Sequence, residues 1–213
     1  ALTTSQVTAL STSLIGVLNS KQLAAMTTAQ VASLTTSQFP SFASDSLKGW
    51  TGTQVVALST ENVAALTTAQ VGGISLAQVA ALTTQQVQAL ETADLVVFAS
   101  SQIRSLTTEQ VVALTTEQVR SLTPTLLSSM TSAQFGAMEV DDLKVLTTEQ
   151  VGNVTSTQIR ALSTAQLVAL TTSQVPYLTT EVVSKLTVGQ VAALTTDQVV
   201  ALTTAQVAAF TTA

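Results

Sequence analysis

The sequence predicts an all-α fold, a solenoid or superhelix of very short helices with one helix in each eight-residue repeat. Three observations support this prediction. The octad L-T-T-x-Q-V-x-A recurs in register, and the 208 residues from Leu2 to Ala209 make 26 full octads without an insertion. Each octad carries the residues of a helix N-terminus, and the charged residues lie where a helix dipole favours them. A β-solenoid is the alternative, because threonine and valine also favour strands.

The first octad shows the helix-start pattern. Thr3 is a preferred N-cap residue and Gln6 follows three residues later, which makes a capping box. Leu2 and Val7 flank the box at the spacing of a hydrophobic staple. Because the pattern returns every eight residues, each helix must also end within eight residues. We expect the first helix over about residues 4–9, and each later helix in the same register.

The charged and proline residues follow this register. Every acidic residue falls at the cap or in the first three helical positions, and six of the seven basic residues fall near the end of the octad, with Lys21 as the exception. A helix dipole favours this distribution. Pro124 falls at the first helical position, where its missing N–H costs nothing. Pro40 and Pro176 fall at the fifth position and are tolerated only if the helices are barely longer than one turn.

Along the chain, most octads are close to the consensus and three depart from it. The atypical octads are residues 42–49, 90–97 and 138–145, so their starts are 48 residues apart. They share a changed cap residue (Ala43, Glu91, Glu139) and a changed box residue (Ser46, Asp94, Asp142). One hypothesis is a six-octad superperiod, which comes either from duplication or from a superhelical turn near six octads. Coincidence among the octads is the alternative.

The shortness of the helices predicts how they pack. A helix of about six residues is unstable alone, so each must pack against neighbouring repeats. We expect the leucine and valine positions inside, and the threonine, glutamine and variable positions toward solvent or bonded to helix ends. We expect Phe39, Phe42 and Trp50 to fill the core. A length of roughly 15 Å per octad suggests four to six octads in each turn.

Composition excludes several classes of function. A net charge of −5 with seven basic residues argues against a nucleic-acid partner, and no apolar run is long enough for a membrane span. Cysteine and histidine are absent, which removes thiolate and imidazole chemistry. We therefore expect no enzymatic activity, catalytic residue, cofactor, metal site or small-molecule substrate. Carboxylates at Glu91 with Asp94, and at Glu139 with Asp141 and Asp142, could bind calcium, but they lack a calcium-loop motif and are explained as helix-start acids.

Two resemblances follow from the octad. Residues 106–114, L-T-T-E-Q-V-V-A-L, resemble the helix-start signature of transcription activator-like effectors. That family has a much longer repeat with a base-reading loop, so DNA reading does not carry over to a period of eight. The whole chain is similar to the LTTxQV octapeptide arrays of very large bacterial proteins, some of which look secreted or surface-attached. This resemblance implies a spacer or stalk.

These observations lead to one expected organisation and two expected functions. Residues 1–213 are expected to form a single continuous octapeptide-repeat array, and a fragment of a longer one because residues 211–213 stop just after a cap. The expected function is a stalk, spacer or self-assembling filament of an extracellular or cell-surface bacterial protein, with itself as partner. The alternative is an adhesin-like binding module that contacts a surface, ice or a glycan through its threonine and glutamine face.

Overall fold

The computed structural model describes residues 2–210, and in this range each octad folds into one short helix. Most are α-helices, and two, η1 and η2, are 3-10 helices. No strand occurs in residues 2–210, so the predicted solenoid of short helices is confirmed and the β-solenoid alternative is wrong. Thr3 adopts extended backbone angles, φ −79° and ψ 163°, as the N-cap residue that precedes α1.

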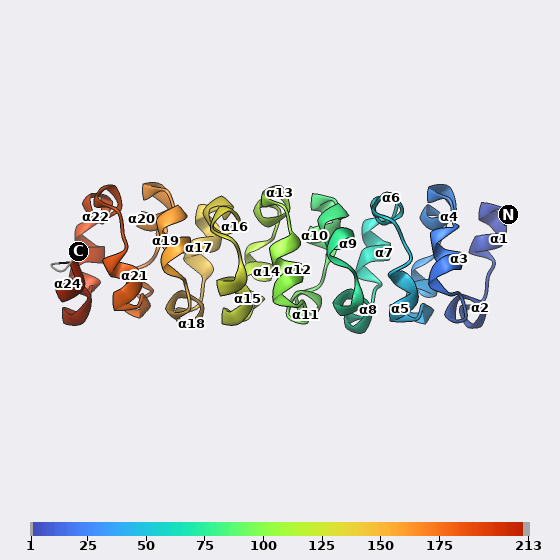
Figure 1. Ribbon diagram of the computed structural model, residues 1–213, viewed down its shortest axis with the longest axis horizontal. Coiled ribbons are helices and arrows are strands. Elements are labelled where there is room, and N and C mark those ends of the chain that lie inside the picture. Colours follow the sequence, from blue (N-terminus) through green and yellow to red (C-terminus); the bar gives the residue numbers. More distant parts are fainter. Residues whose placement is uncertain (1, 211–213) are drawn as a thin grey trace. The chain divides into compact units, whose positions relative to one another are not determined.

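The helices belong to two compact units, Ala1–Ala113 and Leu114–Ala213. In the first unit, coloured blue to green in Figure 1, the helices are α1 (Thr4–Thr8), α2 (Thr12–Gly16), α3 (Ser20–Ala24), α4 (Thr28–Ala32), η1 (Thr36–Ser41), α5 (Ser44–Leu47), α6 (Gly52–Val56), α7 (Thr60–Ala64), α8 (Thr68–Gly73), α9 (Leu76–Ala81), α10 (Thr84–Ala89), α11 (Thr92–Leu95), α12 (Ser100–Ser105) and α13 (Thr108–Val112).

The second unit is coloured green to red in Figure 1. Its helices are α14 (Thr116–Ser121), α15 (Pro124–Ser129), α16 (Ser132–Ala137), α17 (Val140–Val145), α18 (Thr148–Gly152), α19 (Ser156–Ala161), α20 (Thr164–Ala169), η2 (Val175–Tyr177), α21 (Thr180–Ser184), α22 (Val188–Ala193), α23 (Thr196–Ala201) and α24 (Thr204–Phe210).

Within each unit, a helix packs against the helix three octads later. In the first unit α5 packs on α8 and α6 on α9, and in the second α16 packs on α19 and α21 on α24. The expected turn of four to six octads was therefore too large. Each octad contributes mainly one leucine, one valine and one glutamine to the interior. Because these few side chains fill only a narrow core, a small number of octads surrounds it.

The core of each unit follows the two apolar positions of the octad. The valine position is almost completely buried through most of the array, and the leucine position is buried from Leu34 to Leu178 except at Leu66 and Ile74. This confirms the predicted inward placement of leucine and valine. Phe39, Phe42 and Trp50 are buried together with ring centroids 5.4–6.0 Å apart, as expected for core filling. No helix in residues 2–210 is long and apolar enough to cross a membrane.

The two interior prolines coincide with the two 3-10 helices. Pro40 lies in η1 and Pro176 lies in η2. Each lies five residues after the threonine at the cap position of its octad (Thr35 and Thr171), where its missing N–H removes the bond that would make this turn α-helical. The octad register continues unchanged on both sides, because a helix of about one turn depends little on that bond.

Close approach between helices three octads apart restricts some small positions. A Cβ at Gly49 would overlap the main-chain carbonyl of Ser20, and a Cβ at Gly136 would lie 2.8 Å from the carbonyl oxygen of Ala161. Gly189 is different, because a Cβ there would meet nothing within 4 Å. The small residues therefore matter where two helix backbones meet, and not at every repeat.

In the first unit, the spacing of the atypical octads has a structural counterpart. The atypical octads 42–49 and 90–97 contain α5 and α11, and both of these helices pack against α8. Figure 1 shows the three helices along one edge of the unit. Six octads are thus two steps of three along one row, and not a single turn, so the superhelical-turn form of the superperiod hypothesis is wrong; its other form, duplication of six octads, stays a hypothesis.

Candidate functional site

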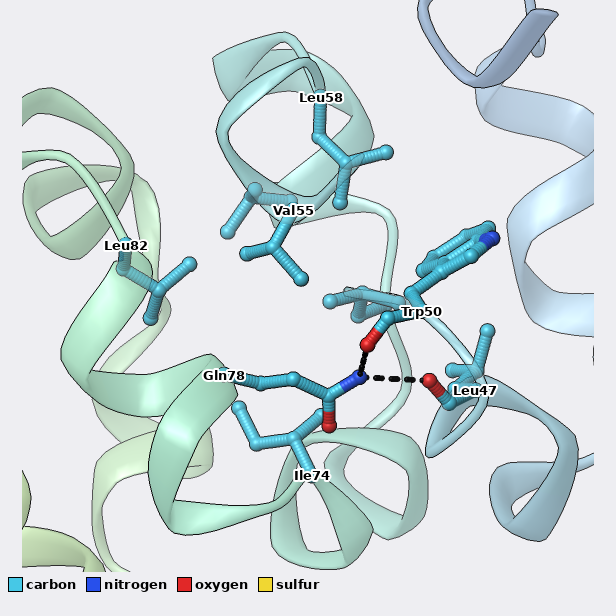
Figure 2. Close-up of a pocket in the computed structure, with 9 residues that line it drawn as sticks. Leu47, Trp50, Val55, Leu58, Ile74, Gln78 and Leu82 are labelled. Carbon is cyan, nitrogen blue, oxygen red and sulfur yellow. Dashed lines mark hydrogen bonds between the residues drawn. The ribbon is translucent and has the colours of Figure 1, made fainter. Parts of the chain in front are cut away.

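The most distinctive chemical feature of the array is a buried glutamine in nearly every octad. Gln78 is an example: its Oε1 accepts a hydrogen bond from the Ser75 N–H at 2.8 Å, which completes the capping box. Its Nε2 donates to the carbonyl oxygens of Leu47 at 2.7 Å and Trp50 at 2.9 Å (Figure 2). One amide thus joins three octads: its own, the third before it and the fourth before it.

The same bonds repeat through both units at sequence separations of 31 and 28 residues. We call the glutamines that make both bonds the glutamine ladder. Its members are Gln38, Gln54, Gln70, Gln78, Gln86, Gln102, Gln110, Gln150, Gln158, Gln174, Gln190, Gln198 and Gln206. All are buried. Of the two alternatives expected for the glutamines, solvent exposure or bonds to helix ends, the second is confirmed.

The hydrogen bonds of the ladder explain why a polar glutamine can be buried at this position of the octad. A buried amide is stable only when its donors and acceptor are paired. The glutamine meets this requirement with main-chain groups that helix ends leave without intrahelical partners. The sequence signal for this second role was the constancy of glutamine. A capping box alone would also accept glutamate, which cannot donate to a carbonyl.

Some octads carry another residue at the ladder position. Asn62 keeps part of the pattern, because its Nδ2 donates to the carbonyl oxygen of Leu34 at 3.1 Å, 28 residues earlier. Leu126 and Val182 are buried without a polar group, and Ser46 is too short to bridge. The remaining buried substitutions are Asp94 and Asp142, and they introduce a charge-bearing group.

Asp94 and Asp142 are the two buried carboxyl groups of residues 2–210, and each has a relative exposure of 2%. Their Oδ2 atoms accept hydrogen bonds from the N–H groups of Glu91 at 3.2 Å and Glu139 at 3.3 Å. Burial raises the pKa of Asp94, and it raises the pKa of Asp142 to about 6. The sequence identified both as first-turn acids but missed their burial, which follows from the position that they share with the buried ladder glutamines.

The exposed acids behave as the helix-start pattern predicts. Asp45 pairs with Lys48 at 2.7 Å, and the hydrogen bond from this lysine lowers the pKa of Asp45. A main-chain hydrogen bond lowers the pKa values of Glu61 and Glu109. These carboxylates therefore cap and pair locally. Among residues 2–210, no three acidic side chains lie close enough to form a metal site.

A small cavity lies beside Gln78 in the first unit (Figure 2). Its volume is about 20 Å³, which is room for a single water, and apolar side chains that include Val55, Val63 and Leu82 line most of it. The Nε1 of Trp50 is buried without a hydrogen-bond partner in the described part of the chain. In Figure 2 this nitrogen points away from the Gln78 amide, so the cavity and the indole donor are separate features.

Comparison with known families matches the octads to one repeat model. The ALTTAQ repeat model matches residues 55–92, 87–124, 148–180 and 183–212, more than half of the chain. The chain belongs to the ALTTAQ repeat family. The first two matches of this ALTTAQ array begin at residues 55 and 87, four octads apart, while the atypical octads 42–49 and 138–145 lie outside the matched stretches. A search of curated proteins found no match.

Proposed function

We propose that this ALTTAQ array is a structural segment, a stalk or spacer within an extracellular or cell-surface bacterial protein. The observation that supports this proposal most strongly is the locality of its bonds. In each unit the amide nitrogens of the ladder glutamines donate to carbonyl oxygens no more than 31 residues earlier. Helices pack on the helices three octads away. Further octads can therefore be added without altering those already present, as in other solenoids.

The chemistry of the octad supports a mechanical role over a catalytic one. The amide groups of the ladder glutamines are hydrogen-bonded within and between repeats, and Asp45 and Asp141 form exposed ion pairs with Lys48 and Lys144. Catalysis would need an acid, a base or a nucleophile that lies in a pocket and is available to react with a substrate. The low charge and the absence of cysteine are compatible with an exported spacer.

Self-association is part of the same proposal. Gln22 is exposed, and its Oε1 accepts from the Asn19 N–H at 2.9 Å as in a ladder octad. Carbonyl groups from further octads, in this chain or in another copy, would complete its bonds. Sedimentation equilibrium across a concentration series tests this part. A single monomer mass at all concentrations would remove self-association from the proposal and leave the stalk in place.

Small-angle scattering tests the stalk. A compact globule of this length would have a radius of gyration of about 17 Å, and the proposal requires a clearly larger value. Deletion of residues 58–81 removes three whole octads. It is expected to shorten the particle while the radius of its cross-section stays constant. Deletion of residues 58–77 is the control, because it breaks the octad register and is expected to unfold the neighbouring repeats. A wild-type value near that of the globule would contradict the proposal.

A further inference from the structure

Two buried carboxyl groups occupy positions where the ladder has an amide. In Asp94 and Asp142 one oxygen accepts from the cap N–H, which is the role of the glutamine Oε1. By analogy with the glutamine, the other oxygen corresponds to the amide nitrogen. In the ladder that nitrogen bonds the carbonyl oxygen 28 residues earlier, and the residue at this separation is Leu66 for Asp94 and Leu114 for Asp142.

Asn62 shows that a side chain of this length reaches that carbonyl. Its Nδ2 donates to the Leu34 oxygen at 3.1 Å across the same 28 residues, although α7 has no capping box of the kind that Asp94 and Asp142 form. Aspartic acid has the same number of side-chain atoms in the same planar arrangement. A neutral carboxyl has an O–H donor that fits this bond, whereas an ionised carboxylate has acceptors only and places oxygen against oxygen.

The charged groups around the two sites do little to stabilise ionised carboxylates. In the first unit, α8 packs on α11 and has no ionisable side chain, and Glu91, the N-cap residue of α11, is acidic. In the second unit, α20 has none, and α14 and α17 supply the charged residues. These are Glu117, Arg120, Glu139, Asp141 and Lys144. Arg120 is exposed, and Lys144 pairs with Asp141 at 2.8 Å.

We propose that Asp94 and Asp142 make the array responsive to pH. When protonated, each carboxyl donates a hydrogen bond to the carbonyl of Leu66 or Leu114 and completes the ladder. When deprotonated, each leaves that carbonyl without a donor and loosens the stack at octads 90–97 and 138–145. This inference does not depend on whether the array is a stalk.

The direction of the effect follows from proton linkage. The pKa of Asp142 rises from 3.8 to about 6 in the folded chain, and that of Asp94 is also raised. The protonated Asp142 carboxyl therefore stabilises the fold fully below pH 3.8, and this stabilisation is lost as the pH rises through about 6. Asp94 acts in the same direction, because burial raises its pKa. Asp45, Glu61 and Glu109 have lowered pKa values, so their effects fall at more acidic pH and outside this window.

The test compares thermal unfolding midpoints between pH 5 and pH 7.5 for wild type and the double variant Asp94→Asn, Asp142→Asn. The wild-type midpoint is expected to fall across this range. The double variant should show no such fall and should have the higher midpoint at pH 7.5, because asparagine donates at every pH. Parallel profiles for the two proteins would overturn the proposal, as would a carbon-13 titration that places the pKa of Asp142 below 4.5.

Two further variants separate the hydrogen bond from general charge effects. Asn62→Asp installs the same carboxyl at a third site and is expected to add a fall in the midpoint between pH 5 and 7.5. Asp141→Asn removes a neighbouring exposed charge that repels the ionised Asp142, so it is expected to lower the pKa of Asp142 slightly and to leave most of the wild-type fall in place, because burial is the larger cause. The proposal fails if Asn62→Asp adds no slope, or if Asp141→Asn flattens the profile as much as Asp142→Asn does.

Discussion

Replacing Gln158 with leucine tests the glutamine ladder directly. Gln158 is fully buried, and its Oε1 accepts from the Thr155 N–H at 2.9 Å. Its Nε2 donates to the carbonyl oxygens of Leu127 at 2.9 Å and Met130 at 3.0 Å. Leucine has a similar volume but no polar atoms. The Thr155 N–H and the Met130 carbonyl would therefore lose these partners, while the Leu127 carbonyl keeps its bond from the Met130 N–H at 3.2 Å.

The expected loss follows from these two groups. A buried main-chain group that loses its partner costs about 1–3 kcal/mol, so the pair costs about 2–6 kcal/mol. The additional apolar surface of leucine returns about 1–2 kcal/mol when it is buried. A net destabilisation of about 3 kcal/mol is therefore expected. The loss should be concentrated in the octads that Gln158 joins, because contacts in a solenoid are local.

Amide hydrogen exchange measures this loss at the affected residues, and urea unfolding measures it for the whole chain. The Thr155 amide should lose most of its protection in the Gln158→Leu variant. Gln22→Leu is the matched control, since Gln22 is exposed and bonds the Asn19 N–H at 2.9 Å without belonging to the ladder. Its cost should be at most about 1 kcal/mol. A Gln158→Leu variant that matches this control and keeps Thr155 protected would refute the importance of the ladder.

Two further pairs of substitutions test the packing between helices. Gly136→Ala should lower the unfolding midpoint because its Cβ meets the Ala161 carbonyl, whereas Gly189→Ala, with open space around it, should stabilise α22 by about 0.5–1 kcal/mol. Similar midpoints for both would contradict the close backbone approach. Val63→Ile adds a methylene beside the cavity and should stabilise the first unit by up to about 0.8 kcal/mol. Val71→Ile, at a fully buried position that does not line the cavity, should destabilise it by about 1–3 kcal/mol, and urea unfolding that reversed this order would refute the cavity argument.

Local structure was predictable because its causes are local. Thr3 and Gln6 form the capping box with each other, as predicted, at 2.8 and 3.2 Å. The same two-way pairing recurs across octads because it needs only residues three positions apart. The 3-10 character of η1 follows from Pro40 alone, since proline removes one N–H at a known place in the helix.

Only the tertiary structure decided how the helices are stacked and what the glutamine does beyond its own helix. The carbonyls that Gln78 reaches are 28 and 31 residues earlier in the chain, and nothing within an octad indicates which earlier octad is adjacent. Burial of Asp94 and Asp142 follows from the same register, so they looked like surface acids until the packing was known. The octad specifies where each helix begins, because capping acts over three residues. The number of octads in a turn depends on how side chains from repeats that are distant in sequence pack together in the shared core.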